Sequence, residues 1–157
     1  MSVAQSVQHF LANRGVRYDL VAHAPTQHSV ATARASHVHQ DNLAKGILVR
    51  CGDGYLLAVL PASRKIRLSD LGTWLEEPVA LATEAEVAKI FSDCDPGSVP
   101  PVAAAYGLPA VLDDSLEGFE HIYFEAGDHR TLVHVSGREF HRLMAEVPHA
   151  HISTSFH

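Results

Sequence analysis

Apolar residues recur along this chain at two spacings, which predict helices and strands in mixed order. Near the start, apolar positions three to four residues apart predict a helix that is capped by Ser2 and ends at Gly15. Residues 17–21 then alternate between apolar and polar, as is typical of a strand. Small side chains follow, and they predict a short helix over residues 31–38.

The longest apolar runs lie on either side of an Asp-Gly pair. Residues 43–50 and 55–60 flank the sequence Cys51-Gly52-Asp53-Gly54, which is a strong signal for a β-hairpin. We expect a loop somewhat longer than the minimal two residues. Because both runs are almost wholly apolar, both strands are expected to be buried on both faces.

Short elements of both kinds make up the rest of the chain. The pattern predicts helices at 69–75 and 83–91 and from the cap Ser136 to Pro148, and strands at 79–82, 110–113, 122–126 and 131–135. Residues 149–157 are expected to form a frayed C-terminal tail.

The order of these elements is not strictly strand–helix–strand. It favours an α+β fold, a mixed α/β single domain over residues 1–148 with a curled, partly antiparallel, barrel-like sheet of about six to seven strands and helices outside it.

Composition supports one compact domain. The chain has 157 residues, of which 46% are hydrophobic and 19% charged. Its net charge of −6 argues against a protein that coats nucleic acid without specificity, because such binding needs many Lys and Arg. Basic residues nevertheless concentrate in the first half, at Arg14, Arg17, Arg34, Lys45, Arg50, Arg64, Lys65 and Arg67. If nucleic acid binds, that half should face it; an ordinary solvated surface is the alternative.

Cysteine and histidine positions limit the chemistry. Cys51 and Cys94 form no C-x-x-C pair, which argues against a zinc knuckle or redox dithiol and fits a reduced cytosolic setting. His37 and His39 point to different faces of a predicted helix, and His149, His151 and His157 fall in the tail, so neither a metal nor a cofactor is expected. With no signal peptide and no long apolar stretch, we expect a soluble cytoplasmic protein that does not enter a membrane.

The stretch Asp95–Pro101 contains three prolines and one glycine. Each proline fixes φ and lacks an N–H, whereas Gly97 can adopt backbone angles that other residues avoid. A stiff, bent loop of this kind can present the amides of Gly97, Ser98 and Val99 to an oxygen atom or a water molecule. A simple connector after a helix is the alternative.

Lys45 stands at the start of an apolar strand, away from other charges. It is either an end residue that extends its ammonium group to solvent or a cation held in a pocket to meet an anion or a carbonyl. A dedicated nucleophile is not indicated, because Ser98 lacks the G-x-S-x-G context and the phosphate-binding glycine loops are absent. The carboxylates of Asp113, Asp114 and Asp128 are best explained as strand-end caps.

Taken together, Lys45 and the G-x-x-x-P loop from Gly97 to Pro101 make the chain resemble the YbaK/ProX/prolyl-tRNA-synthetase insertion-domain family of aminoacyl-tRNA deacylases. The resemblance covers nearly the whole length. It includes the alanine-rich segment before Lys45, the strand that ends in Asp113-Asp114, and the segment 124–129, Phe-Glu-Ala-Gly-Asp-His.

This resemblance implies an enzyme, a hydrolase that cleaves the ester between a mischarged small amino acid and the 3′ end of a tRNA. By analogy Lys45 and Gly97 would be catalytic, the lysine holding the terminal nucleotide or the ester oxygens. The loop amides would position the water or polarise the carbonyl, and the ribose hydroxyl of the substrate would assist proton transfer. The remaining substrate-binding candidates are Ser98, Val99, Pro100 and Pro101 in the loop and Thr32, His23, Thr26, Tyr18 and His129 in the pocket wall.

The implied partner is aminoacyl-tRNA, with an aminoacyl-tRNA synthetase as a second candidate and a monomer or weak homodimer as the active form. Two alternatives stay open: a non-catalytic module that binds aminoacyl-tRNA or a nucleotide beside a synthetase, and a structural interaction module. The sequence departs from the family pattern at Val102-Ala103, where relatives often carry an aromatic residue and a glycine. The identity of the amino acid removed is therefore left open.

Overall fold

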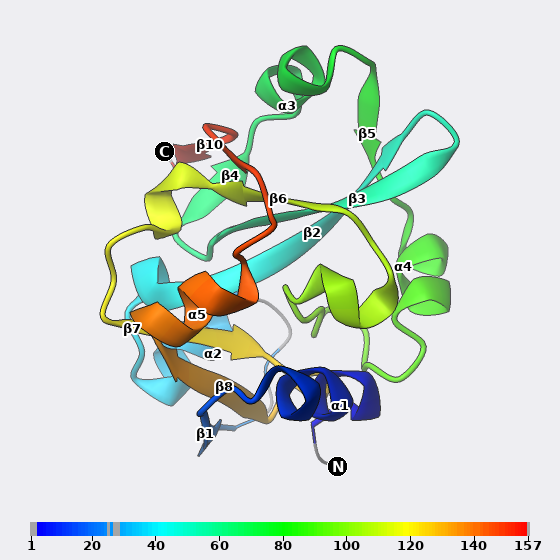
Figure 1. Ribbon diagram of the computed structural model, residues 1–157. Coiled ribbons are helices and arrows are strands. Elements are labelled where there is room, and N and C mark those ends of the chain that lie inside the picture. Colours follow the sequence, from blue (N-terminus) through cyan, green and yellow to red (C-terminus); the bar gives the residue numbers. More distant parts are fainter. Residues whose placement is uncertain (1–2, 25, 27–28, 157) are drawn as a thin grey trace.

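A computed structural model describes residues 3–24, 26 and 29–156 of the chain (Figure 1). Its helices are α1 (Gln5–Arg14), α2 (Ser29–Ser36), α3 (Leu68–Leu75), α4 (Glu84–Ile90) and α5 (Gly137–Leu143), with 3-10 turns η1 (Gln40–Asn42), η2 (Ala103–Tyr106) and η3 (Asp114–Leu116). The strands are β1 (Asp19–Ala22), β2 (Leu43–Cys51), β3 (Gly54–Pro61), β4 (Arg64–Ile66), β5 (Val79–Leu81), β6 (Ala110–Asp113), β7 (His121–Glu125), β8 (Thr131–Ser136), β9 (His149–Ala150) and β10 (Ser153–Ser155).

Several helix ends form where the sequence predicts them. Gly15, at φ 61°, ends α1 in the left-handed conformation that glycine tolerates. Thr83 opens α4 with a complete capping box, and the Ser136 side chain caps α5 by accepting from the amide of Glu139. The cap expected at Ser69 is wrong, because α3 already begins at Leu68 after Arg67. The predicted cap Ser2 lies outside the described residues, as does His157.

An eight-stranded mixed sheet confirms the expected mixed α/β single domain. Its strand order is β1-β8-β7-β2-β3-β6-β9, with β5 also paired to β2, and a separate ladder joins β10 to β4. The pairs β2–β7, β3–β6 and β6–β9 are parallel, and the other pairs are antiparallel. Among the described strands this pairing is an open path that runs from β1 to β9. Figure 1 shows α3 at one end of the molecule and α1 at the opposite end.

The hairpin of β2 and β3 forms the centre of the sheet. Cys51 pairs with Gly54, which leaves a two-residue loop, shorter than the sequence suggested. Gly52 has φ 56°, and this positive angle permits the tight turn. Residues 56–61 of β3 are all buried, whereas β2 is buried only in part. Residues 45–47 of β2 therefore remain partly accessible to solvent.

A gap in the sheet lies along β2. This strand pairs with β7 only at Leu43 and Ala44, and with β5 only from Val49 to Cys51. Between these two contacts, the amide of Ala82 donates to the carbonyl of Leu48, and no described strand pairs with residues 45–48 on that edge. Lys45 and Gly46 thus stand at an opening in the middle of the sheet.

The C-terminal segment is ordered, so the expectation of a frayed tail is wrong. Residues 149–150 add β9 to β6, and residues 153–155 pair with β4. Ile152 between them is fully buried, and its amide donates to Oδ1 of Asp113 over 2.9 Å. One buried isoleucine and a buried aspartate therefore hold a segment that is otherwise polar.

Among the described residues, no helix is both long and apolar enough to cross a lipid bilayer.

Candidate active site

A cavity of about 830 Å³ opens at the gap beside β2. Residues 45–48 of β2 form one wall, and residues 94–97 with Val99 form another. Apolar side chains of α4 and its neighbours complete it, together with Val30, Ala62, Glu125 and Phe156. The structure thus brings Lys45 and Gly97, about fifty positions apart in the sequence, to the walls of one cavity.

Lys45 is half-buried and forms no ion pair with any residue that the structure describes. Burial lowers the pKa of its ammonium group to about 8. Its Nζ atom lies 5.2 Å from the centre of the Phe156 ring, and no carboxylate of the described residues is within ion-pair distance. A lysine that lines a cavity in this state can meet a negatively charged or polarised oxygen.

Two of the three loop amides are free among the described residues. Gly97 has φ 82°, which glycine adopts without strain, and it lines the cavity together with Val99. The amide of Ser98 donates to the carbonyl of Asp95 over 3.1 Å, so the expectation that it faces a ligand is wrong. The described backbone bonds include none donated by Gly97 or Val99. These two amides therefore form the available donor pair.

The Ser98 side chain holds the loop in place. It is fully buried, and its Oγ atom accepts from the amides of Gly127 (3.1 Å) and His129 (3.3 Å) while its hydroxyl hydrogen-bonds the carboxyl group of Glu125. Pro100 and Pro101 are also buried and do not line the cavity. Among the loop candidates, only Gly97 and Val99 reach the cavity; Ser98 and the two prolines support the loop from behind.

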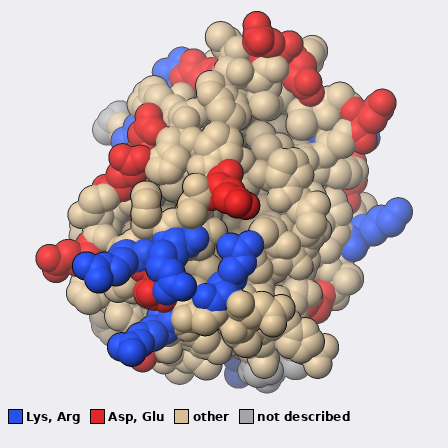
Figure 2. Space-filling model, in the orientation of Figure 1, with Lys and Arg blue, Asp and Glu red and all other residues tan. Residues whose placement is uncertain are grey.

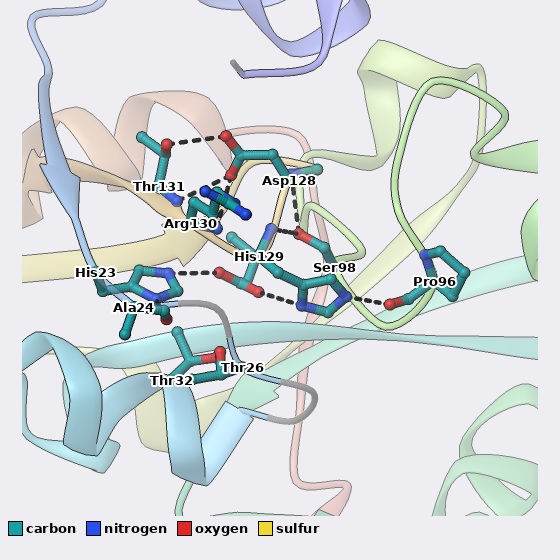
Figure 3. Close-up of polar contacts among 12 residues, drawn as sticks. His23, Ala24, Thr26, Thr32, Pro96, Ser98, Asp128, His129, Arg130 and Thr131 are labelled. Carbon is teal, nitrogen blue, oxygen red and sulfur yellow. Dashed lines mark hydrogen bonds and ion pairs between the residues drawn. The ribbon is translucent and has the colours of Figure 1, made fainter. Parts of the chain in front are cut away.

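Glu125 at the end of β7 lines the cavity. Figure 3 shows its carboxyl group, without a label, between the labelled side chains of His23 and His129. His23 Nε2 lies 3.4 Å from its Oε1 atom, and His129 Nδ1 lies 3.5 Å from its Oε2 atom. On its far side, His129 donates through Nε2 to the carbonyl of Pro96. A buried carboxyl group is thereby linked through one imidazole to the loop that carries Gly97.

Burial raises the pKa of Glu125 to about 7, against the smaller opposing effects of His129 and Ser98. The hydrogen-bond partners explain why a proton is favoured there. Nδ1 of His23 lies 2.7 Å from the carbonyl of Ala24, and a carbonyl only accepts, so both histidines donate away from Glu125. The nitrogens that face the carboxyl group are bare in neutral rings. A protonated Glu125 can therefore donate to either nitrogen, and neither nitrogen has another hydrogen-bond partner among the described residues.

The other sequence candidates lie outside the cavity wall. Thr32 is fully buried, and its Oγ1 atom lies 2.5 Å from that of Thr26. Tyr18 is 40% exposed and does not line the cavity. His23 and His129 contact Glu125 without lining the cavity themselves. Val102 and Ala103, where the sequence departs from the family pattern, belong to the main core cluster.

The absence of a side chain at residue 46 widens the cavity. A Cβ atom there would lie 3.2 Å from a methyl group of Leu57 and 3.3 Å from one of Val99. Across the cavity, α4 and the turn that follows it present the apolar side chains Ala85, Val87, Ala88 and Phe91. This side of the cavity suits an apolar group, whereas the side of Lys45 suits a polar one.

Basic side chains also gather away from the cavity. Figure 2 shows them over α5 and the adjoining end of α1. Arg142 donates to the carbonyl of Arg14 and pairs with Glu139, which also accepts from the amide of Arg17. The basic residues of the first half are thus dispersed, and of these only Lys45 lines the cavity.

One exposed group within the described residues, Asp114, Glu117 and His149, has metal-ligand spacing.

Sequence reasoning missed Glu125 and Phe156 as site residues. Alternation along β7 places Glu125 on the same side as the partly exposed His121 and Tyr123, which predicts a solvent-facing carboxylate. The available signal was its position directly before the turn Ala126-Gly127-Asp128-His129. Phe156 was overlooked because the tail was expected to be frayed.

Comparisons with known proteins identify the family and the fold of the chain. The sequence profile of the aminoacyl-tRNA editing domain matches residues 23–143. A search of curated proteins gives no match.

Similar solved structures include a hypothetical protein (TM-score 0.84, 24% identity, 96% of this chain and 100% of that chain). Another is a proposed trans-editing enzyme for prolyl-tRNA synthetase (TM-score 0.83, 24% identity, 98% and 100%). A signal transduction protein candidate from Marinobacter aquaeolei is also similar (TM-score 0.79, 15% identity), with 98% of this chain covering 31% of that one. These likenesses show a shared fold. Since the family profile spans well over half of the sequence, the chain belongs to the aminoacyl-tRNA editing domain family.

Proposed function

We propose that this protein hydrolyses the ester bond between a mischarged small amino acid and the 3′ end of a tRNA. The observation that carries the proposal is the shared cavity of Lys45 and Gly97. Lys45, without an ion-pair partner among the described residues, and two residues with free amides line one cavity. These groups match what ester hydrolysis needs, which is stabilisation of the negative charge that develops on the carbonyl oxygen. The family assignment supports the same chemistry.

Each residue of the site has a separate role in the proposed reaction. Lys45 holds the ribose or ester oxygens of the terminal nucleotide, and the amides of Gly97 and Val99 polarise the ester carbonyl or hold the attacking water. Water adds to the carbonyl carbon, the bond to the ribose oxygen breaks, and that oxygen takes up the proton that water releases. The cluster of Glu125, His129 and Ser98 positions the loop.

The size of the cavity is consistent with this substrate. At about 830 Å³ it lies in the range of ligand pockets and can admit a terminal nucleotide together with a short aminoacyl group. Likeness to a proposed trans-editing enzyme for prolyl-tRNA synthetase supports a synthetase as a second partner. Charged tRNA is used in the cytoplasm, which is the compartment we propose.

A deacylation screen tests the proposal. The wild-type protein is mixed with tRNAs charged with glycine, alanine, serine, cysteine or proline, and release of each amino acid is followed. We expect release of at least one, and loss of that release in Lys45→Ala with folding intact by circular dichroism. Lys89→Ala, which removes an exposed lysine on α4, is the matched control and should behave as wild type.

The same screen also tests the alternative that the protein binds aminoacyl-tRNA without hydrolysing it. Tight binding of aminoacyl-tRNA without release of any amino acid would replace the enzyme with a binding module. If Lys45→Ala instead unfolds the protein, the lysine has a structural role and the proposed function loses its main support.

A further inference from the structure

Phe156 presents an open aromatic ring at the mouth of the cavity. Five large apolar side chains are exposed among the described residues, and two of them, Leu81 (54%) and Phe156 (48%), line this cavity. Exposed apolar surface that is gathered at a cavity mouth marks a place where a ligand loses water. The ring therefore requires an explanation beyond core packing.

The ring is held there by an anchored segment. Ser153, three residues before Phe156, is buried; its Oγ atom donates to Asp113 over 2.8 Å, and Arg64 donates to the same Oγ atom over 2.7 Å. The ladder of β10 with β4 extends this anchorage to Ser155, directly before the ring. Because the ring is at the end of a paired strand, little further conformational entropy is lost when a ligand binds to it.

Lys45, which lies beside the Phe156 ring, determines which ligand fits there. Nζ of Lys45 lies over the ring, 5.2 Å from its centre, so the ammonium group and the ring border the same part of the cavity. Aromatic faces stack on nucleobases of any sequence, and an ammonium group attracts ribose and ester oxygens or phosphate. A nucleotide carries both features one sugar apart. An aliphatic aminoacyl group would instead find its apolar wall on α4, on the other side of the cavity.

We propose that Phe156 is the stacking platform for the terminal nucleobase of the RNA, with Lys45 on the ribose of the same nucleotide. This inference rests on the proposed function, and it adds the C-terminal segment to the substrate site. The base lies at the mouth, the ester beside Lys45 and Gly97, and the amino acid side chain against α4.

A pair of small esters tests the platform by hydrolysis. One is an aminoacyl ester of adenosine 5′-monophosphate, and the other is the same aminoacyl ester of ribose 5-phosphate. Because one stacked base contributes about 1–3 kcal/mol, we expect wild-type kcat/KM to be about 10- to 100-fold higher for the adenosine ester. Phe156→Ala should remove this preference through KM, and Phe156→Tyr should retain it. Equal loss on both esters, or a gain of activity in Phe156→Ala, would overturn the inference.

A binding measurement separates this inference from the proposed function. Trp74 is the sole tryptophan, so Phe156→Trp in a Trp74→Phe background places one fluorophore at the platform. We expect adenosine 5′-monophosphate to quench it and ribose 5-phosphate to leave it unchanged. Quenching without hydrolysis of either ester supports the platform and removes the deacylase function. Hydrolysis without base preference or quenching does the reverse.

Discussion

Oε2 of Glu125 lies 3.5 Å from Nδ1 of His129, and the same imidazole donates from its other nitrogen to the carbonyl of Pro96. A carboxyl group on a strand of the sheet is thus connected to the loop of the candidate active site. The near nitrogen of His129 can accept a proton from Glu125, because the far nitrogen already donates its own. A protonated Glu125 would therefore strengthen the connection to the loop.

The first prediction concerns stability against pH. The pKa of Glu125 is raised from 4.5 to about 7 in the folded protein, so its stabilising contribution is complete below about pH 4.5 and is lost as pH rises through 7. The loss for a shift of this size is on the order of 3 kcal/mol. Glu125→Gln stays neutral and can donate to His129, so its stability should exceed that of wild type increasingly from pH 4.5 to 8.

Urea denaturation at pH 4.5, 6 and 8 measures this difference in the free energy of unfolding. Glu146→Gln, at an exposed site, is the control and should follow wild type. Parallel curves for wild type and Glu125→Gln would show that the carboxyl group is not coupled to folding.

The second prediction concerns activity against pH. Since the pKa of Lys45 is lowered to about 8, its charge disappears as pH rises through that value, and the catalysed rate of deacylation should fall there. Arginine stays charged far above this range, so whatever activity Lys45→Arg retains should not decline between pH 7 and 9.5. Quenched single-turnover reactions, corrected for uncatalysed hydrolysis, give both profiles. A wild-type rate that keeps rising to pH 9.5 would refute the role of the charge.

The third prediction concerns Gly46. A methyl group there meets Leu57 and Val99 at 3.2–3.3 Å, so Gly46→Ala should narrow the cavity and lower stability by about 1–3 kcal/mol. Activity should fall more for larger aminoacyl groups than for glycyl or alanyl groups. The ratio of kcat/KM values between substrates is the readout. Gly54→Ala, where the nearest atom is 4.0 Å away, serves as the control; an unchanged ratio would place the aminoacyl group elsewhere.

The fourth prediction concerns the C-terminal segment. Ile152 is fully buried, so Ile152→Ala should lower the free energy of unfolding by about 2–5 kcal/mol. His151→Ala, one residue earlier and exposed, should change it little. Thermal or urea denaturation of both variants gives the comparison. A change below about 0.5 kcal/mol for Ile152→Ala would mean that the segment is not part of the folded core.

Local signals in the sequence predict much of this fold. The capping box at Thr83, the cap at Ser136 and the glycine end at Gly15 depend on neighbouring residues only, and they form as expected. The Asp-Gly hairpin is local too, although its loop is shorter than expected. The tail could not be predicted, because its order depends on Asp113, which is 39 positions from Ile152.

The candidate site divides in the same way. Residue type and loop chemistry pointed to Lys45 and Gly97, and both line the cavity. Glu125 was missed since strand periodicity places it toward solvent, and its burial depends on contacts with His23, His129 and Ser98 that the local sequence does not define. The amide of Ser98 was misjudged because its partner, the carbonyl of Asp95, belongs to a turn that residue types alone do not define.

The catalytic role of Lys45 is tested most directly by the single-turnover rate at which Lys45→Ala releases the amino acid from the preferred mischarged tRNA. We expect a rate at least about 100-fold below wild type, as is usual when an oxyanion-stabilising group is removed, with an unchanged urea midpoint and with Lys89→Ala at the wild-type rate. A rate within twofold of wild type in folded Lys45→Ala would show that Lys45 does not contribute to the deacylation reaction.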